Sequence, residues 1–232
     1  MRSSILSLAL LSLLAGCAVL PDASPFRRDP EAWLPRSERV CVFALRSEVD
    51  FEGDGRSRLE RLTQLLLAEL RGRGFEVSPP AATQAAWQRG VEELGAIFDP
   101  HSGRRDDARY EAGRLRAFQE LGDALACDVT LSPSLVQVVA PWAGPSLEWD
   151  GAALEWSGGY GTHGWVGALS LWVVVHDLQG EVLYFGTGGI EPAARFVGGR
   201  DFEPLRHSQL LRDEARNRAG LLRALEGFDR GR

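Results

Sequence analysis

Apolar residues in this chain follow two different periods, which predict an alternation of strands and helices. A short β-branched run at 39–45 predicts a buried strand. Apolar positions then recur on one helical face over 57–72, 83–98 and 106–126, and each segment predicts a helix that packs one side on a core. Residues 75–77 and 128–139 predict two further strands, and Pro133 predicts an edge position or a bulge in the second.

The C-terminal part predicts a hairpin followed by a helix. Two strands, at 166–176 and 181–190, flank the turn-forming sequence Asp177-Leu178-Gln179-Gly180. The first of them is apolar on both faces, as in a central strand. A helical stripe over 206–228 ends the chain. The whole order predicts an α/β fold: a single domain over 38–228, with a mixed sheet of about five strands and helices packed on it.

The segment at 141–165 joins two of these strands and has no clear period. It is rich in Gly and Trp. One interpretation is a partner-binding surface, because long ordered loops often carry function and large aromatic side chains often anchor interfaces. Its candidate residues are Trp142, Trp149, Trp156 and Tyr160. The alternative is that the same Trp side chains fold back as a lid over the sheet.

The first 16 residues have the pattern of a targeting segment rather than of a folded element. Arg2 is followed by an apolar stretch at 5–14, which is too short to span a bilayer as a helix. Leu14-Ala15-Gly16-Cys17 then resembles the lipobox of bacterial lipoproteins. The resemblance implies that the chain is cut before Cys17, which receives a diacylglycerol and anchors the protein to a membrane. Residues 1–16 are then a signal peptide.

The residue after the cysteine bears on location. In bacterial lipoproteins, Asp at this position retains the protein in the inner membrane, whereas this chain has Ala18. The resemblance therefore implies the outer membrane, on its periplasmic face. Residues 17–37 are polar and contain Pro21, Pro25, Pro30 and Pro35, a composition that predicts a flexible tether.

The charge balance narrows the class of partner. The formal net charge is −6; without Arg2 it is −7, from 25 basic and 32 acidic residues. A negative chain is a poor match for nucleic acid or anionic lipid headgroups as its main partner. All basic residues are Arg, which excludes catalysis by Lys. With Cys17 lipidated, Cys41 and Cys127 remain, and an exported protein lies in an oxidising compartment where a pair can bond.

Three segments resemble the periplasmic domain of curli-secretion lipoproteins, penicillin-binding-protein activator lipoproteins and the amino-terminal domain of TolB-like proteins. They are 39–43, 125–129 and 170–184. The resemblance covers roughly 38–228 and implies a related fold in which the strands that carry Cys41 and Cys127 are neighbours, so that a disulfide is expected. The two long alternating hairpins that a curli channel needs do not stand out, so no pore is expected.

Other motifs do not meet the requirements of the sites they resemble. Gly159–Gly164 matches G-x-G-x-x-G but precedes a strand, whereas a dinucleotide site needs a following helix. Asp50, Glu52 and Asp54 resemble a calcium loop whose twelfth position is Arg61. The four histidines are not at metal-ligand spacing. We therefore expect no catalytic residue, metal or cofactor.

The function expected from the sequence is that of a non-enzymatic, membrane-tethered adaptor or assembly factor with an envelope protein as its partner. Two alternatives stay open. One is a hydrolase of cell wall or lipid, which on cell-wall glycan would need two inward carboxylates. The other is a subunit of a secretion ring, which makes an oligomer a further possibility.

Overall fold

The computed structural model describes residues 24–92, 104, 106–155, 163–198 and 201–230. The described chain begins with two short helices, α1 (Pro30–Trp33) and η1 (Leu34–Arg36). Then follow β1 (Arg39–Val42), β2 (Arg46–Ser47), α2 (Asp54–Gly72), β3 (Glu76–Ser78), α3 (Pro80–Glu92) and α4 (Asp107–Leu125). The C-terminal part holds β4 (Val129–Ala143), β5 (Ser146–Trp149), β6 (Ala152–Glu155), β7 (His163–His176), β8 (Val182–Pro192), β9 (Ala194–Gly198), β10 (Asp201–Pro204), η2 (His207–Gln209) and α5 (Glu214–Ala224).

The main sheet is mixed, which confirms the predicted fold class. β1 lies between β3 and β4 and runs parallel to both. β4 pairs antiparallel with β7 along its whole length, and β7 pairs antiparallel with β8. β7 is therefore a central strand, as its two apolar faces predict. Eight strands join this sheet, where the sequence predicts about five, because β2 and β5 also pair with β4, and β6 pairs with β5.

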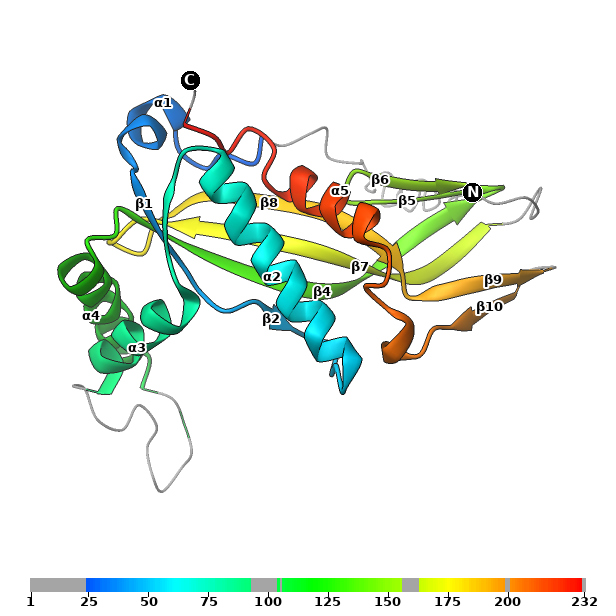
Figure 1. Cartoon of the computed structure of the whole chain (residues 1–232), viewed down its shortest axis with the longest axis horizontal. Helices are drawn as coiled ribbons and strands as arrows, with labels where there is room; N and C mark the ends of the chain where they lie inside the picture. The colour runs from blue at the N-terminus through cyan, green and yellow to red at the C-terminus, as the bar shows by residue number, and fades with distance from the viewer. Residues whose placement is uncertain (1–23, 93–103, 105, 156–162, 199–200, 231–232) are drawn as a thin grey trace, which may run out of the picture.

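Helices cover the two faces of the sheet unequally. α2 and α5 lie side by side on one face, whereas α3 and α4 lie at one end of the molecule and the β9–β10 hairpin at the other (Figure 1). The largest core forms under α2 and α5. It combines Leu66 and Leu221 of these helices with Leu131, Leu171 and Val173 of the sheet.

A close approach between α5 and β8 depends on glycine. A Cβ at Gly186 would overlap the carbonyl oxygen of Ala224, and one at Gly188 would overlap that of Gly220. The missing side chains let the helix backbone rest directly on the strand.

The residues just before β1 differ from the expected tether. Residues 17–23 lie outside the described residues, but from Pro25 the chain is docked on the outer edge of β8. Arg27 N donates to Leu183 O at 2.9 Å, and Phe185 N donates to Pro25 O at 2.8 Å. The Phe26 ring lies 5.2 Å from that of Tyr184. We call residues 25–36 the clasp; apolar side chains in this Pro-rich stretch supply the burial that a tether lacks.

Two other segments differ from their predictions. The expected helix at 206–228 is broken: Leu211 has a left-handed φ of 58°, and α5 starts only after Asp213, whose side chain accepts from Arg216 N. The expected loop at 141–165 is largely strand, since β4 and β7 extend into it and β5 and β6 form within it. Pro133 is not on an edge strand but lies at an irregularity, as the bulge alternative predicts: β4 pairs with β1 up to Leu131 and with β2 from Ser134, and the β1–β2 side has one extra residue between them.

Candidate functional site

Two of the four residues proposed for partner binding lie inside the protein. Trp142 and Trp149 are only 6% and 8% exposed and belong to a second core with Leu147 and Val166. The Trp149 indole N–H donates to Leu169 O at 3.1 Å. Burial of these two side chains corrects the surface interpretation and favours the lid. The β5–β6 hairpin turns Trp149 onto the sheet, whereas Trp142 belongs to β4 and its ring lies 5.5 Å from that of Phe202 in β10. Trp156 and Tyr160 lie outside the described residues.

The two cysteines lie on neighbouring strands and form a disulfide. Cys41 of β1 and Cys127, two residues before β4, have Cα atoms 5.7 Å apart. This distance lies within the range that disulfides adopt. The bond ties the end of α4 to the first strand and lies in a third core with Phe43, Phe118 and Leu121.

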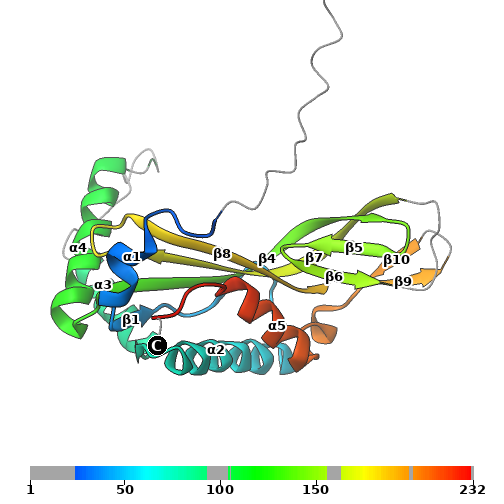
Figure 2. The same cartoon turned by 90° about the horizontal axis from the view of Figure 1, so that it is seen from above.

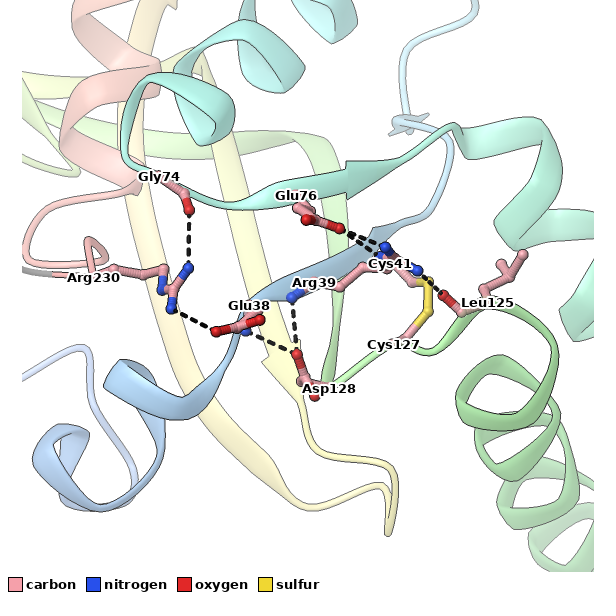
Figure 3. Close-up of polar contacts among 9 residues, drawn as sticks. All are labelled: Glu38, Arg39, Cys41, Gly74, Glu76, Leu125, Cys127, Asp128 and Arg230. Carbon is pink, nitrogen blue, oxygen red and sulfur yellow. Dashed lines mark hydrogen bonds and ion pairs between the residues drawn. A yellow bond between two sulfur atoms is a disulfide. The ribbon is translucent and has the colours of Figure 1, made fainter.

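Polar contacts surround this junction (Figure 3). The Arg39 guanidinium donates to Glu76 Oε2 and to Leu125 O, the last residue of α4, at 3.0 and 3.1 Å. Asp128 Oδ2 accepts from the backbone N–H groups of Glu38 and Arg39, each at 2.8 Å. Arg230 links the C-terminal segment to Gly74 O at 3.2 Å. These contacts join β1, β3, α4 and the chain's end, so the cluster positions elements rather than reacting with a substrate.

One part of the sheet has no covering element among the described residues. On β4, β7 and β8, side chains that alternate with the main core point to the opposite face. Six of them are half-buried and form two cross-strand rows: Ser132, Val174 and Phe185 in one, and Ser134, Trp172 and Thr187 in the other. We call these six residues the open face. Figure 2 shows no described helix on this side between α4 and the strands at the far end.

The next row on either side of the open face is covered. Toward α4 the row contains Thr130 and His176, and the Phe118 ring lies 5.7 Å from that of His176. Toward β5 and β6 it contains Ser170 and Gly189, and a Cβ on Gly189 would meet Trp149 and Ala152. The open face is therefore a strip of sheet bounded at both ends by packed elements.

The chemistry of the open face is mixed. Trp172 and Phe185 meet edge to face with ring centroids 5.5 Å apart, and three hydroxyl groups flank them. The guanidinium of Arg27, from the clasp, lies 5.8 Å from the Phe185 ring centroid. Aromatic and aliphatic area with hydroxyl groups and a cation at the rim is a composition typical of protein interfaces. The strip lacks the convergent ionisable groups that catalysis requires.

Several polar atoms on this side of the sheet have no hydrogen-bond partner among the described residues. They are Thr130 Oγ1, Ser170 Oγ, Trp172 Nε1 and His176 Nδ1. Burial, with a smaller contribution from Arg114, lowers the pKa of His176. The neutral ring is thus favoured, and this border of the open face stays uncharged.

A buried carboxylate that the sequence analysis missed lies at the end of β8. Glu191 is 7% exposed, its Oε1 accepts from Leu211 N, and burial raises its pKa. It lines an apolar cavity of about 240 Å³ with Leu147, Leu154 and Phe202. The only sequence signal is an acid that directly follows a buried apolar run, Gly188-Gly189-Ile190. Its bond to the turn before α5 assigns it a structural role.

Other candidate chemistry is not brought together. Glu191 is the one buried carboxylate among the described residues, whereas a glycosidase needs two that face each other. No three His, Cys, Asp or Glu side chains within the described ranges are placed to hold a metal, and these ranges include Asp50, Glu52 and Asp54. Gly159–Thr162 of the Gly-rich motif lie outside the described residues, and His163 and Gly164 begin β7.

Comparison with known proteins yields only distant likenesses. No family model matches the chain, and no curated protein matches it. A PelC dodecamer from Paraburkholderia phytofirmans is 10% identical with a TM-score of 0.35, over 84% of this chain and 91% of that chain. The LpoB C-terminal domain from Salmonella enterica is 12% identical with a TM-score of 0.30, over 71% and 99%. At these TM-scores neither likeness bears on function.

Proposed function

We propose that this protein is a lipoprotein of the outer membrane, held on its periplasmic face by lipid on Cys17, and that it acts as a non-enzymatic adaptor for an envelope protein. The observation that carries the adaptor role is the open face. Its six residues come from three strands of a rigid sheet, so the surface is already formed before a partner binds. Preorganisation of this kind reduces the entropy lost on association.

The partner's contact surface follows from the same residues. The partner should present apolar area to Trp172, Val174 and Phe185. Between these contacts it should offer hydrogen-bonding groups to the hydroxyls of Ser132, Ser134 and Thr187. The two rows alone are smaller than a standard protein interface. The partner therefore also reaches the rim, where Arg27 favours an acidic side chain.

Two further features support an exported, anchored protein. The sequence Leu14-Ala15-Gly16-Cys17 supports lipidation, and a disulfide between Cys41 and Cys127 suits an oxidising compartment. The helices of the described residues are too short or too polar for any of them to cross a bilayer. Lipid on Cys17 is then the proposed means of membrane attachment.

Site-specific photo-crosslinking in whole cells tests the adaptor role. A photoreactive amino acid is placed at Thr187, on the open face, or at Leu222, an exposed position on α5 on the other side of the sheet. We expect a discrete protein adduct from position 187, none from 222, and loss of the 187 adduct when Trp172→Ala is added. No adduct from 187, or the same adduct from both positions, would refute the proposal.

A further inference from the structure

The clasp shortens the link between the lipid and the domain. The composition of residues 17–37 predicts a flexible tether of 21 residues, which could extend to roughly 70 Å at about 3.5 Å per residue. The structure docks the chain from Pro25 onward, and the first described residue is Ser24. Only residues 17–23, seven in all, remain between the lipid and the described chain. Their fully extended length is about 25 Å.

The clasp is held by more than its two backbone hydrogen bonds. Phe26 lies between the rings of Trp33 and Tyr184, at 6.3 and 5.2 Å, and Trp33 in turn lies 6.1 Å from Phe228. Leu34 is 6% exposed and joins the main core. Contacts to β8 and to the C-terminal segment hold the clasp in place, so the chain leaves the domain at a fixed point.

That exit point lies at one edge of the sheet. The clasp pairs with β8 through Phe26 and Tyr184, and the strands that follow across the sheet are β7, β4 and then β1 or β2. In Figure 1 the clasp, in dark blue, lies along β8, on the side of the sheet away from β2. With a spacing of about 4.8 Å between strands, β2 lies roughly 14 Å farther from the exit than β8 does.

We propose that the clasp sets the domain edge-on against the membrane that carries its lipid, with β8 nearest the bilayer, and that the open face is thereby presented to a protein embedded in that same membrane. This inference rests on the proposed lipidation of Cys17 and on the adaptor role. The open face starts at the clasp, where Arg27 lies over Phe185, and it extends across β8, β7 and β4. In this orientation the open face is perpendicular to the bilayer plane. A neighbouring protein embedded in the same membrane can then contact it.

Energy transfer on vesicles tests the orientation with the full lipidated chain. The protein is inserted through its lipid into vesicles of phosphatidylethanolamine and phosphatidylglycerol that carry acceptor dyes on their headgroups. A donor dye is attached at Val182→Cys on β8 or at Arg46→Cys on β2, both exposed positions. Because Cys17 is lipidated and Cys41 is bonded to Cys127, the introduced thiol is the one that reacts.

We expect stronger transfer from position 182 than from position 46. A spacer of 20 Gly and Ser residues inserted between Pro21 and Asp22 leaves the clasp intact but raises the typical reach of the link from about 15 Å to about 30 Å. The spacer should abolish the difference between the two donors. Phe26→Ala should reduce it by loosening the clasp. Equal transfer from both donors in the unmodified chain, or stronger transfer from 46, overturns the proposed orientation.

The Thr187 crosslink tests the class of partner. The partner in the adduct is identified by mass spectrometry, and its uncrosslinked form is then followed through alkaline carbonate extraction. We expect a partner that stays with the membranes, and an adduct yield that falls when the spacer is present. An adduct with phospholipid alone would mean that the open face lies on the bilayer, and a partner that carbonate releases would mean a soluble protein; either overturns the inference. A carbonate-released partner would leave the adaptor role intact. The two proposals can therefore fail separately.

Discussion

Single buried groups in this protein hold the turns between elements. The peptide of Leu211, with its left-handed φ, is bound at both ends: Glu191 accepts its N–H, and Asn217 Nδ2 donates to its carbonyl oxygen at 3.1 Å. A buried donor or acceptor left without a partner costs about 1–3 kcal/mol. These two side chains therefore allow the chain to break its helix before α5 at little expense of free energy.

Glu191 makes the stability of the protein depend on pH. Because burial raises its folded-state pKa above the ordinary value of 4.5, its contribution is fully present below pH 4.5 and is lost as the pH rises through the folded-state pKa. We expect Glu191→Gln, which keeps an acceptor for Leu211 N, to gain stability relative to the wild type as the pH rises from 4 to 8. Urea unfolding across this range measures the effect. A pH-independent difference, or an equal trend in the exposed-site control Glu60→Gln, would contradict it.

Gly188 sets the distance between α5 and β8. We expect Gly188→Ala to lower the free energy of unfolding by about 1–3 kcal/mol, because its Cβ overlaps the Gly220 carbonyl oxygen and both segments are backbone. Gly72→Ala is the matched control, since its Cβ meets no atom within 4 Å and alanine favours a helix. Thermal unfolding compares the two. Equal melting temperatures would show that α5 can shift without loss.

At the scale of elements, two features each cover part of the sheet: the helix α4, which the disulfide holds in place, and the β5–β6 hairpin. The bond between Cys41 and Cys127 holds α4 against β1, and the hairpin turns Trp149 onto β7 and β8. The strip between them stays open because no described helix reaches it. The site is thus defined by where two covering elements stop.

Reduction of the disulfide should destabilise the whole domain. Its two cysteines are 86 residues apart, and the chain-entropy estimate for a loop of that length is about 4–5 kcal/mol. We expect the urea midpoint to fall when the protein is reduced and its thiols are blocked. The control is the Cys41→Ser/Cys127→Ser chain, treated with the same thiol-blocking reagent. Its urea midpoint should not change when reductant is added. An unchanged urea midpoint would contradict this prediction. It would show that reduction adds little conformational entropy to the unfolded chain.

Two tryptophans distinguish a core position from a binding position. Trp149→Ala should lower the free energy of unfolding by about 3–5 kcal/mol, because the side chain is 8% exposed and its N–H is bonded. Trp172→Ala should lower it by less, since the ring is half-buried on the open face, while abolishing the Thr187 crosslink. If Trp172→Ala is the more damaging to stability, Trp172 acts as core and the open face loses its central contact.

At the scale of the whole molecule, function is proposed to depend on the relation between the anchor and the open face. The clasp brings the lipid's exit point to the edge of the same sheet that carries the open face. A link of seven residues holds that edge within about 25 Å of the lipid. The membrane then limits which partners can approach.

The anchor itself is tested by Cys17→Ser. We expect this chain to remain uncut or to appear in the soluble periplasmic fraction, because neither lipid nor a membrane-crossing helix of the described residues would hold it. Cell fractionation and the mass of the mature protein measure both outcomes. The Cys41→Ser/Cys127→Ser chain is the control and should stay on the membrane. A Cys17→Ser chain that is still cut and membrane-bound would contradict lipid attachment at this residue.

The sequence by itself determined the fold class and several of the main elements. The helices α2 and α4 and the strands β7 and β8 follow from periods of apolar residues that depend only on local geometry, and the mixed sheet follows from their order. Cys41 and Cys127 could be paired before the structure because the families that the chain resembles place their strands side by side. The burial of Glu191 could not be predicted in this way. An acidic residue after an apolar run gives the same sequence pattern whether its side chain faces solvent or a buried turn.

Only the tertiary structure decided which surfaces are covered. The sequence around Trp142 and Trp149 would be the same in a loop and in a core. Their burial depends on how the β5–β6 hairpin folds back and, for Trp142, on the contact with Phe202 of β10. The aromatic partners of the clasp, Tyr184 of β8 and Phe228, lie far along the chain, so its sequence alone resembled a tether. The open face joins Ser134, Trp172 and Thr187 from three strands. Its exposure depends on where α4 and the hairpin end, a long-range property that no local period encodes.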